Sequence, residues 1–216
     1  MHCFQRKNRS VSAVLIGSIL FSGSALTASS LANDTRPSAN NPAPAWSGET
    51  STGETISLDQ FSGKIVVMEW TNHVCPFVQK HYKGGNMQAT QAVAAKTDDV
   101  VWVTVISSAP GKQGHVSGAE ADALTRDRGA MPDYVVLDEA GTIGRDYGAR
   151  TTPQIFVING DGTLKYDGAM DDSPSAKLSS LEGATNYALG AMTAVMVGDD
   201  PNPATTKPYG CSVKYK

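Results

Sequence analysis

A Cys-Pro pair at the junction of a predicted strand and a predicted helix constrains this chain more than any other feature. Residues 64–71 are a run of apolar and β-branched residues, long enough for a buried strand. Residues 72–74 interrupt the run, and Cys75-Pro76 follows. Proline is favoured in the first turn of a helix, because the N–H group that it lacks has no partner there. The pattern therefore places the Cys75 thiol at the N-terminus of a helix.

The rest of the chain alternates between strand and helix patterns. A helical face runs over residues 77–96, and Gly84-Gly85 interrupts it, which predicts a kink or two shorter helices. Further strands are predicted at 100–106, 134–138, 154–158 and 163–166, and further helices at 119–128, just before Tyr147-Gly148 and at 183–197. Strands that alternate with helices and end in a hairpin favour an α/β fold, with a mixed sheet of about five strands and helices on both faces.

The first 32 residues have the three-part layout of a secretory signal. Three basic residues precede an uncharged apolar stretch over 11–28, and Ser30-Leu31-Ala32 puts small residues where a signal peptidase cleaves. The stretch is short and diluted by Ser and Gly, so a retained membrane helix is the weaker interpretation. We therefore expect export to the bacterial periplasm or the cell exterior, with no stable membrane anchor after cleavage.

The remaining chain is predicted to form one domain. Residues 33–47 are rich in Asn, Pro, Ala and Ser, which predicts a flexible leader ahead of a domain at 48–216. The formal net charge is −3 and no Lys/Arg cluster is present, so nucleic acid is not an expected partner. No phosphate loop or dinucleotide motif indicates a cofactor.

Two cysteines, Cys75 and Cys211, lie beyond the predicted signal. An exported protein lives where disulfides persist, so an even pair suggests a bridge. Cys211 can be the resolving partner that attacks a sulfenic acid or a mixed disulfide on Cys75. It can instead form a permanent disulfide with Cys75, which would leave no working nucleophile, or stay free and contact another protein. The polar, Pro-rich tail over 199–216 would normally be disordered unless this cysteine ties it down.

The position of Cys75 suits a reactive thiol. The thiolate is the nucleophile, and a free thiol with a pKa of about 8.5 is mostly protonated at neutral pH. A helix N-terminus brings unpaired N–H groups and a positive dipole end to the sulfur, which favours the thiolate. His73 either adds positive charge or a hydrogen bond, or only satisfies the helix start. Trp70 either belongs to the core or offers a platform for substrate.

Motifs along the chain resemble those of the thioredoxin superfamily, and more narrowly those of peroxiredoxin-like redoxins. They occur in the family's order, from about residue 44 to 216: Asn72-His73-Val74-Cys75-Pro76, Asp138-x-x-Gly141 with Tyr147-Gly148, Pro153-x-x-Phe156-Val157-Ile158, Tyr166-x-Gly168-x-x-Asp171-Asp172 and Gly210-Cys211-Ser212-x-Lys214. The resemblance implies a thioredoxin-like fold. It also implies that Pro153 is the cis proline beside the reactive cysteine.

Around Cys75, the chain departs from the motifs of thioredoxins and from those of peroxiredoxins. Val78 stands where a thioredoxin has its second cysteine, so a local dithiol mechanism is not available. Asn72 stands where a peroxiredoxin has a hydroxyl that orients peroxide, and Glu69 where its proline is expected. Peroxidase activity is therefore not assumed from the resemblance.

The sequence favours an exported thiol–disulfide oxidoreductase or thiol-based antioxidant. Its predicted partners are a protein or small thiol or disulfide, or a peroxide, with no cofactor. The predicted catalytic residues are Cys75, Cys211, His73 and Pro153, and the predicted substrate contacts are Trp70, Asn72, Pro76 and Thr152.

Two alternatives remain open from the sequence. One is a binding module in which a static Cys75–Cys211 disulfide only stabilises the fold. The other is a metal carrier that uses Cys75 and His73 together with His81 or Cys211. Outside that role, His81 is expected at the surface or an interface of the helix.

Overall fold

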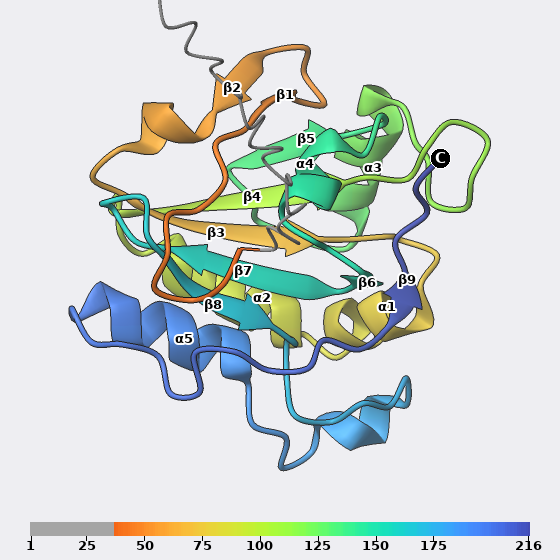
Figure 1. The fold of residues 1–216 in the computed structure, drawn as a ribbon. Coiled ribbons are helices and arrows are strands. Elements are labelled where there is room, and N and C mark those ends of the chain that lie inside the picture. Colours follow the sequence, from red (N-terminus) through yellow and green to blue (C-terminus); the bar gives the residue numbers. More distant parts are fainter. Residues whose placement is uncertain (1–36) are drawn as a thin grey trace, which may run out of the picture. The chain divides into compact units, whose positions relative to one another are not determined.

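A mixed sheet forms the centre of the computed structural model, which describes residues 37–216 (Figure 1). Its strands are β3 (Ile65–Trp70), β4 (Val100–Ile106), β5 (Tyr134–Leu137), β7 (Gln154–Ile158) and β8 (Leu164–Gly168). The five strands lie in the order β5-β4-β3-β7-β8. Strand β4 is parallel to β3 and β5, whereas β7 is antiparallel to β3 and β8. The predicted mixed sheet is confirmed.

The two central strands are buried along their whole length. Every residue of β3 and β4 is buried, because helices or irregular segments cover both faces of the sheet. A strand covered on both faces has no polar side, which explains the continuous apolar runs in the sequence.

Three helices pack on one face of the sheet (Figure 1). They are α1 (Pro76–Lys83), α2 (Asn86–Ala94) and α5 (Tyr187–Met196). Gly85 separates α1 from α2 with a φ of 75°, a left-handed conformation that suits glycine. The interruption predicted at Gly84-Gly85 is therefore confirmed as a boundary between two helices. A further helix, α3 (Gly118–Asp127), packs beside β5.

Shorter elements cover the other face. They are α4 (Thr142–Asp146), the 3-10 helix η1 (Leu58–Phe61) and the hairpin of β1 (Ser47–Glu49) and β2 (Thr55–Ser57). Trp46, Phe61, Ile143 and Tyr147 form a core there with the sheet. A second 3-10 helix, η2 (Leu178–Leu181), lies between β8 and α5 along the chain.

The folded part of the chain begins before residue 48. The backbone N–H of Asn40 donates to the carbonyl oxygen of Leu164 at 2.7 Å, and that of Ala43 donates to Gly162 at 2.9 Å. Trp46 is buried in the core. Residues 40–43 therefore pair with the β7–β8 hairpin, and the carbonyl oxygen of Trp46 accepts from the Leu58 N–H at 3.1 Å. These bonds do not fit a flexible leader that extends to residue 47. The predicted signal over residues 1–32 lies outside the described residues.

The last 18 residues, from Asp199 to Lys216, run back over the domain and are called the tail below. The tail holds β9 (Cys211–Ser212), which pairs antiparallel with β6 (Thr151–Thr152). Further along, the hydroxyl of Tyr215 donates to the carbonyl oxygen of Ala149 at 2.7 Å. Backbone and side-chain hydrogen bonds therefore order a segment whose composition alone would predict disorder.

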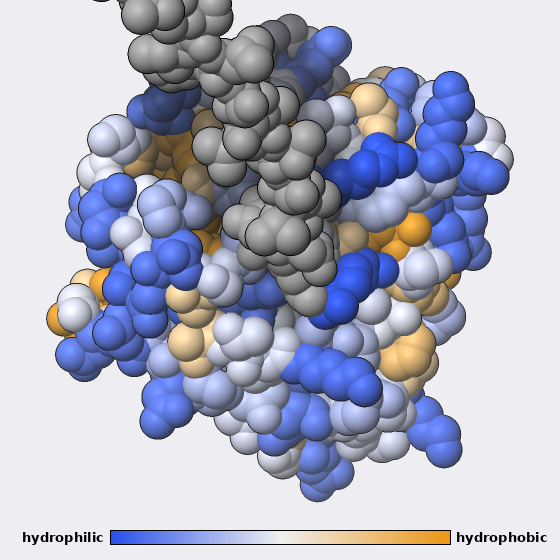
Figure 2. Space-filling model, in the orientation of Figure 1, coloured by the Kyte–Doolittle hydropathy of each residue, from blue (hydrophilic) through white to orange (hydrophobic). Residues whose placement is uncertain are grey.

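The surface is largely polar. On the face shown in Figure 2, apolar side chains are scattered among hydrophilic ones. Between residues 37 and 216, no helix combines the length and apolar character needed to cross a membrane.

Candidate active site

Cys75 caps the N-terminus of α1, as the sequence predicts. Its backbone is extended, with φ of −70° and ψ of 122°, and Pro76 begins the helix. The Cys75 N–H donates to the carbonyl oxygen of Asn72 at 3.0 Å, which closes a turn between β3 and α1. The sulfur is thus placed where the free N–H groups of the first helical turn can stabilise negative charge.

The loop before β7 lies against the Cys75 sulfur. The Thr152–Pro153 peptide bond is cis, and the Cys75 thiol donates a hydrogen bond to the carbonyl oxygen of Thr152 at 3.1 Å. The sequence resemblance implied this position for Pro153. A catalytic role for Pro153 stays a prediction.

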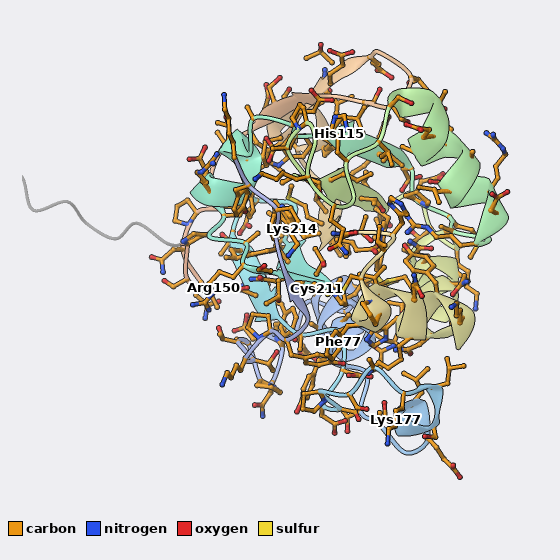
Figure 3. The ribbon with its side chains drawn as sticks, turned by 90° about the vertical axis from the view of Figure 1, so that its right-hand side faces the viewer. Phe77, His115, Arg150, Lys177, Cys211 and Lys214 are labelled. Carbon is orange, nitrogen blue, oxygen red and sulfur yellow. The ribbon has the colours of Figure 1, made fainter. Side chains whose placement is uncertain are left out.

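The tail brings the second cysteine to the same loop. Cys211 is paired with Thr152 in the β6–β9 ladder, and its side chain packs against the core cluster that contains Cys75. Both cysteines are free thiols in this structure. Figure 3 shows the tail crossing the face toward the viewer, with Cys211 between the labels of Lys214 and Phe77. Two cysteines far apart in the sequence therefore meet at the start of α1.

The surroundings of the two thiols separate their pKa values. Burial raises the pKa of Cys75, but hydrogen bonds with the Cys211 thiol, the Val78 backbone and Thr152 outweigh it, and the pKa is lowered overall. Burial raises the pKa of Cys211 to about 11, and the hydrogen bond and the charge of Cys75 add to the rise. Cys75 is therefore the thiol that ionises first and can act as the nucleophile.

Gly210 lets the tail approach the loop before β7. Its φ is 139°, and a Cβ atom at this position would collide with the carbonyl oxygen of Thr152. That oxygen is the one to which the Cys75 thiol donates. A glycine is required here because any side chain would push Cys211 away from Cys75.

Replacing Gly210 by alanine is expected to slow formation of a Cys75–Cys211 disulfide and to lower the free energy of unfolding by about 1–3 kcal/mol. The rate of thiol loss under a fixed oxidant and urea denaturation measure the two effects. Gly198→Ala is the matched control, because Gly198 also has a positive φ, 82°, but its Cβ would meet no atom within 4 Å. An equal rate of disulfide formation in both variants would contradict this role of Gly210.

Comparison with known proteins identifies the family. The family model named Redoxin matches residues 38–185, which is more than half of the chain. This chain belongs to the redoxin family. It is a redoxin of the thioredoxin superfamily, as the motif order indicated. A comparison with curated proteins found no match.

Two solved structures share the redoxin's fold. A hypothetical protein from Sinorhizobium meliloti 1021 is 20% identical, with 83% of this chain and 95% of that chain covered and a TM-score of 0.62. An uncharacterized conserved protein from Geobacillus kaustophilus is 22% identical, with 82% and 92% covered and a TM-score of 0.66. At these identities the likeness concerns the fold alone.

Asn72 and His73 shape the loop ahead of Cys75 in this redoxin. The buried Asn72 side chain accepts from the Val74 N–H at 3.0 Å and donates to the Gln113 carbonyl oxygen at 3.3 Å. Within residues 37–216, the His73 ring forms no hydrogen bond with Cys75, and burial together with the positive charge of Arg128 lowers its pKa. Asn72 therefore holds the loop, and its predicted contact with substrate stays a prediction.

The other predicted substrate contacts, Trp70, Thr152 and Pro76, differ in how far they are exposed. Trp70 is fully buried between Tyr147 and Phe156, and its Nε1 donates to the hydroxyl of Ser107 at 3.0 Å. Trp70 therefore has the core position that the sequence analysis left open, and its contact with substrate stays a prediction. The backbone edge of Thr152 is occupied by the tail, whereas Pro76 is exposed.

A buried carboxylate, Glu69, lies in β3 ahead of the site, where the motif comparison noted only that it replaces an expected proline. Glu69 of β3 is fully buried and accepts hydrogen bonds from the hydroxyl of Tyr82 at 2.9 Å and from Nε1 of Trp102 at 3.3 Å. Burial raises its pKa above the usual range. Its sequence signal is a single charged residue inside an apolar strand, which is unusual unless the charge has buried partners.

A hollow of about 440 Å³ borders the loop that precedes α1. His73, Val78, Tyr82, Leu124 and Arg128 are among the residues that line it. Val78, in the place of a second thioredoxin cysteine, forms part of its wall. Among the described residues, no group of three or more His, Cys, Asp or Glu side chains is arranged to hold a metal ion.

Proposed function

We propose that this redoxin is an exported thiol–disulfide oxidoreductase in which Cys75 is the nucleophile and Cys211 its resolving partner. The observation that carries the proposal is that both cysteines meet at Thr152 of the cis-proline loop. Cys211 pairs with Thr152 in the β6–β9 ladder, and the Cys75 thiol donates to the Thr152 carbonyl oxygen at 3.1 Å. The lowered pKa of Cys75 and the raised pKa of Cys211 support the assignment of the two roles.

The proposed reaction begins with the Cys75 thiolate. It attacks one sulfur of a disulfide substrate, forms a mixed disulfide and releases the first thiolate. The Cys211 sulfur then gives up its proton and attacks the Cys75 sulfur, so that the second substrate thiolate leaves. The substrate disulfide gains two electrons, the enzyme dithiol loses two, and its two protons pass to the released thiolates.

A disulfide is a better-supported substrate class than a peroxide. Orienting a peroxide in the way of a peroxiredoxin needs a side-chain hydroxyl at the position of Asn72. The Asn72 amide is instead engaged with Val74 and Gln113. We therefore place peroxide second, as the substrate of a slower side reaction.

Return to the dithiol form is proposed to begin at Cys211. Its side chain is partly exposed, whereas Cys75 is fully buried. An external thiolate would attack the Cys211 sulfur, and Cys75 would leave as thiolate. A second external thiol would then release Cys211. Lower pKa makes the better leaving group, so exposure and pKa favour the same direction.

Export agrees with this chemistry. The N-terminal pattern predicts a secretory signal, and a cycling disulfide suits an oxidising compartment. The partners proposed are protein or small-molecule thiols and disulfides.

The decisive experiment counts thiols in the purified protein without its signal. Mild dithiol treatment is expected to convert a form with no titratable thiol into one with two, without loss of native circular dichroism. Cys211→Ser should accumulate a mixed disulfide with a model disulfide substrate, because Cys75 attacks but nothing resolves it. A Cys75–Cys211 disulfide that resists reduction until the protein unfolds would instead support a static structural disulfide and contradict the proposal.

A further inference from the structure

A buried ion pair joins α1 to the segment that follows β8. Nζ of Lys80 lies 3.1 Å from Oδ2 of Asp171, and the exposed fractions of the two side chains are 0% and 1%. Lys80 follows Cys75 on the same helix, and Asp171 comes from the Tyr-x-Gly-x-x-Asp-Asp motif. Nζ also donates to the carbonyl oxygen of Ser173 at 2.9 Å. Burying two charges is costly, so this pair needs all of its hydrogen bonds.

Tyr209 of the tail completes this cluster. Its hydroxyl donates to Oδ1 of Asp171 and accepts from Nζ of Lys80 at 2.9 Å. Nε2 of His81 lies 3.3 Å from the hydroxyl oxygen of Tyr209. The ring packs edge-on against Phe77, with 5.7 Å between ring centroids. Each of these partners of Tyr209 except Asp171 belongs to α1, the helix that begins next to Cys75.

His81 has a different position from the one its sequence predicts. The His81 side chain is buried, and its Nδ1 lies 2.8 Å from the side-chain Nδ2 of Asn86. Burial lowers the pKa of His81 to about 4, and the charge of Lys80 adds to this effect, whereas Asp171 opposes it. With His81 neutral, the charged groups in hydrogen-bond contact with Tyr209 are Lys80 and Asp171, and the charge of Asp172 also acts on it.

The cluster holds one side of Cys211, and a separate set of bonds holds the other. Tyr209 precedes Cys211 by two residues. After Cys211, the Val213 N–H donates to the Arg150 carbonyl oxygen at 3.0 Å, and the Lys214 carbonyl oxygen accepts from Ala109 at 2.9 Å. Figure 3 shows Cys211 on the tail between the labels of Phe77 and Lys214. Cys211 itself pairs with Thr152, and these two sets of contacts flank that pairing on either side. Of the three, the Tyr209 cluster is the one that fixes the tail to the helix of Cys75.

We infer that Tyr209 is a positioning residue that holds the Cys211 thiol against Cys75 and so sets the stability of the disulfide between them. This inference rests on the proposed redox cycle. A thiol on a loose tail has a low effective concentration, whereas one held in the reacting geometry has a far higher one. Loss of the Tyr209 anchor lowers this effective concentration without changing either cysteine.

Replacing Tyr209 by alanine is expected to lower the equilibrium constant for forming the disulfide by about ten- to a hundredfold. Because a tenfold change corresponds to about 30 mV for this two-electron couple, the reduction potential rises by about 30–60 mV. Tyr209→Phe keeps the ring on Phe77 but removes the hydroxyl from Lys80 and Asp171. Its expected effect has the same sign and is smaller.

The test equilibrates the purified protein with dithiothreitol buffers and measures the oxidised fraction by thiol labelling and mass. Tyr147→Phe is the matched control, because Tyr147 is also a buried tyrosine whose hydroxyl donates to a backbone oxygen, that of Pro44 at 2.9 Å, but it lies outside the tail. It should lose stability and keep the wild-type potential.

The outcomes separate this inference from the proposed function. Raised potentials in both Tyr209 variants, with native circular dichroism and an unchanged Tyr147→Phe, support it. If Tyr209→Ala does not fold, the reduction potential of Tyr209→Phe, compared with that of the wild type, is the test of the inference. Wild-type potentials in the Tyr209 variants would overturn the inference while leaving the redox cycle intact. A wild-type protein without a reversible disulfide would overturn both.

Discussion

Replacing Cys75 by serine is expected to reduce disulfide reduction by about a thousandfold or more, which is about 4 kcal/mol of transition-state stabilisation. A serine hydroxyl does not ionise near neutral pH, so the helix N-terminus has no anion to stabilise there. Turnover of a model disulfide with a dithiol reductant measures the effect. Wild-type activity should rise with pH below the ordinary cysteine pKa, because hydrogen bonds lower the pKa of Cys75 despite its burial.

Cys211→Ser is the control for this prediction. Serine is similar in size to cysteine, so the tail should keep its pairing with β6. The variant should lose steady-state turnover. It should still release one equivalent of substrate thiol in a single turnover, when Cys75 forms the mixed disulfide. Cys75→Ser should release none. A Cys75→Ser variant with a remaining burst would assign the nucleophile to Cys211 and contradict the proposed order of attack.

Replacing Asp171 by alanine is expected to lower the free energy of unfolding by about 3–5 kcal/mol. The substitution leaves the ammonium of Lys80 buried without its counter-ion and removes an acceptor from Tyr209. Urea denaturation of the reduced protein measures the loss. Its reduced form is used so that the disulfide does not contribute to stability.

The chain offers a matched pair at the surface. Lys165 and Asp200 lie 2.8 Å apart, but Asp200 is 68% exposed. Asp200→Ala should therefore cost less than about 1 kcal/mol, since water already solvates both charges. The double variant Lys80→Met with Asp171→Leu should recover much of the lost stability, because no charge is then left unpaired. Equal losses in Asp171→Ala and Asp200→Ala would contradict the assigned burial of this pair.

Local sequence patterns predicted most of the sheet and helices. The strand predicted at 100–106 has the bounds of β4, and the strand predicted at 154–158 has those of β7. These segments are strongly apolar and β-branched, so burial and local preference agree. The short strands β1 and β2 were missed, because three mostly polar residues in each carry no periodic signal.

Residues with polar side chains were harder to place. Trp70 and Asn72 lie next to the Cys75 loop in the sequence, yet both are buried and hold structure. His81 and Lys80 lie in a buried cluster with Tyr209, and no sequence pattern placed Lys80 there. A single sequence does not reveal which side chains come from distant segments to satisfy a buried polar group.

By itself, the sequence determined the strand, the Cys-Pro junction and the helix, because strand preference, the position of proline and the helix terminus all depend on neighbouring residues. Together with the predicted signal over residues 1–32, it also predicts thiol chemistry at Cys75 and Cys211. Only the tertiary structure decided that the tail pairs with the cis-proline loop and that Tyr209, Lys80 and Asp171 meet beside it. These contacts join residues that lie 59 positions apart at Thr152 and Cys211, and 129 positions apart at Lys80 and Tyr209. Their geometry depends on how the whole sheet and its helices pack, which no local pattern encodes.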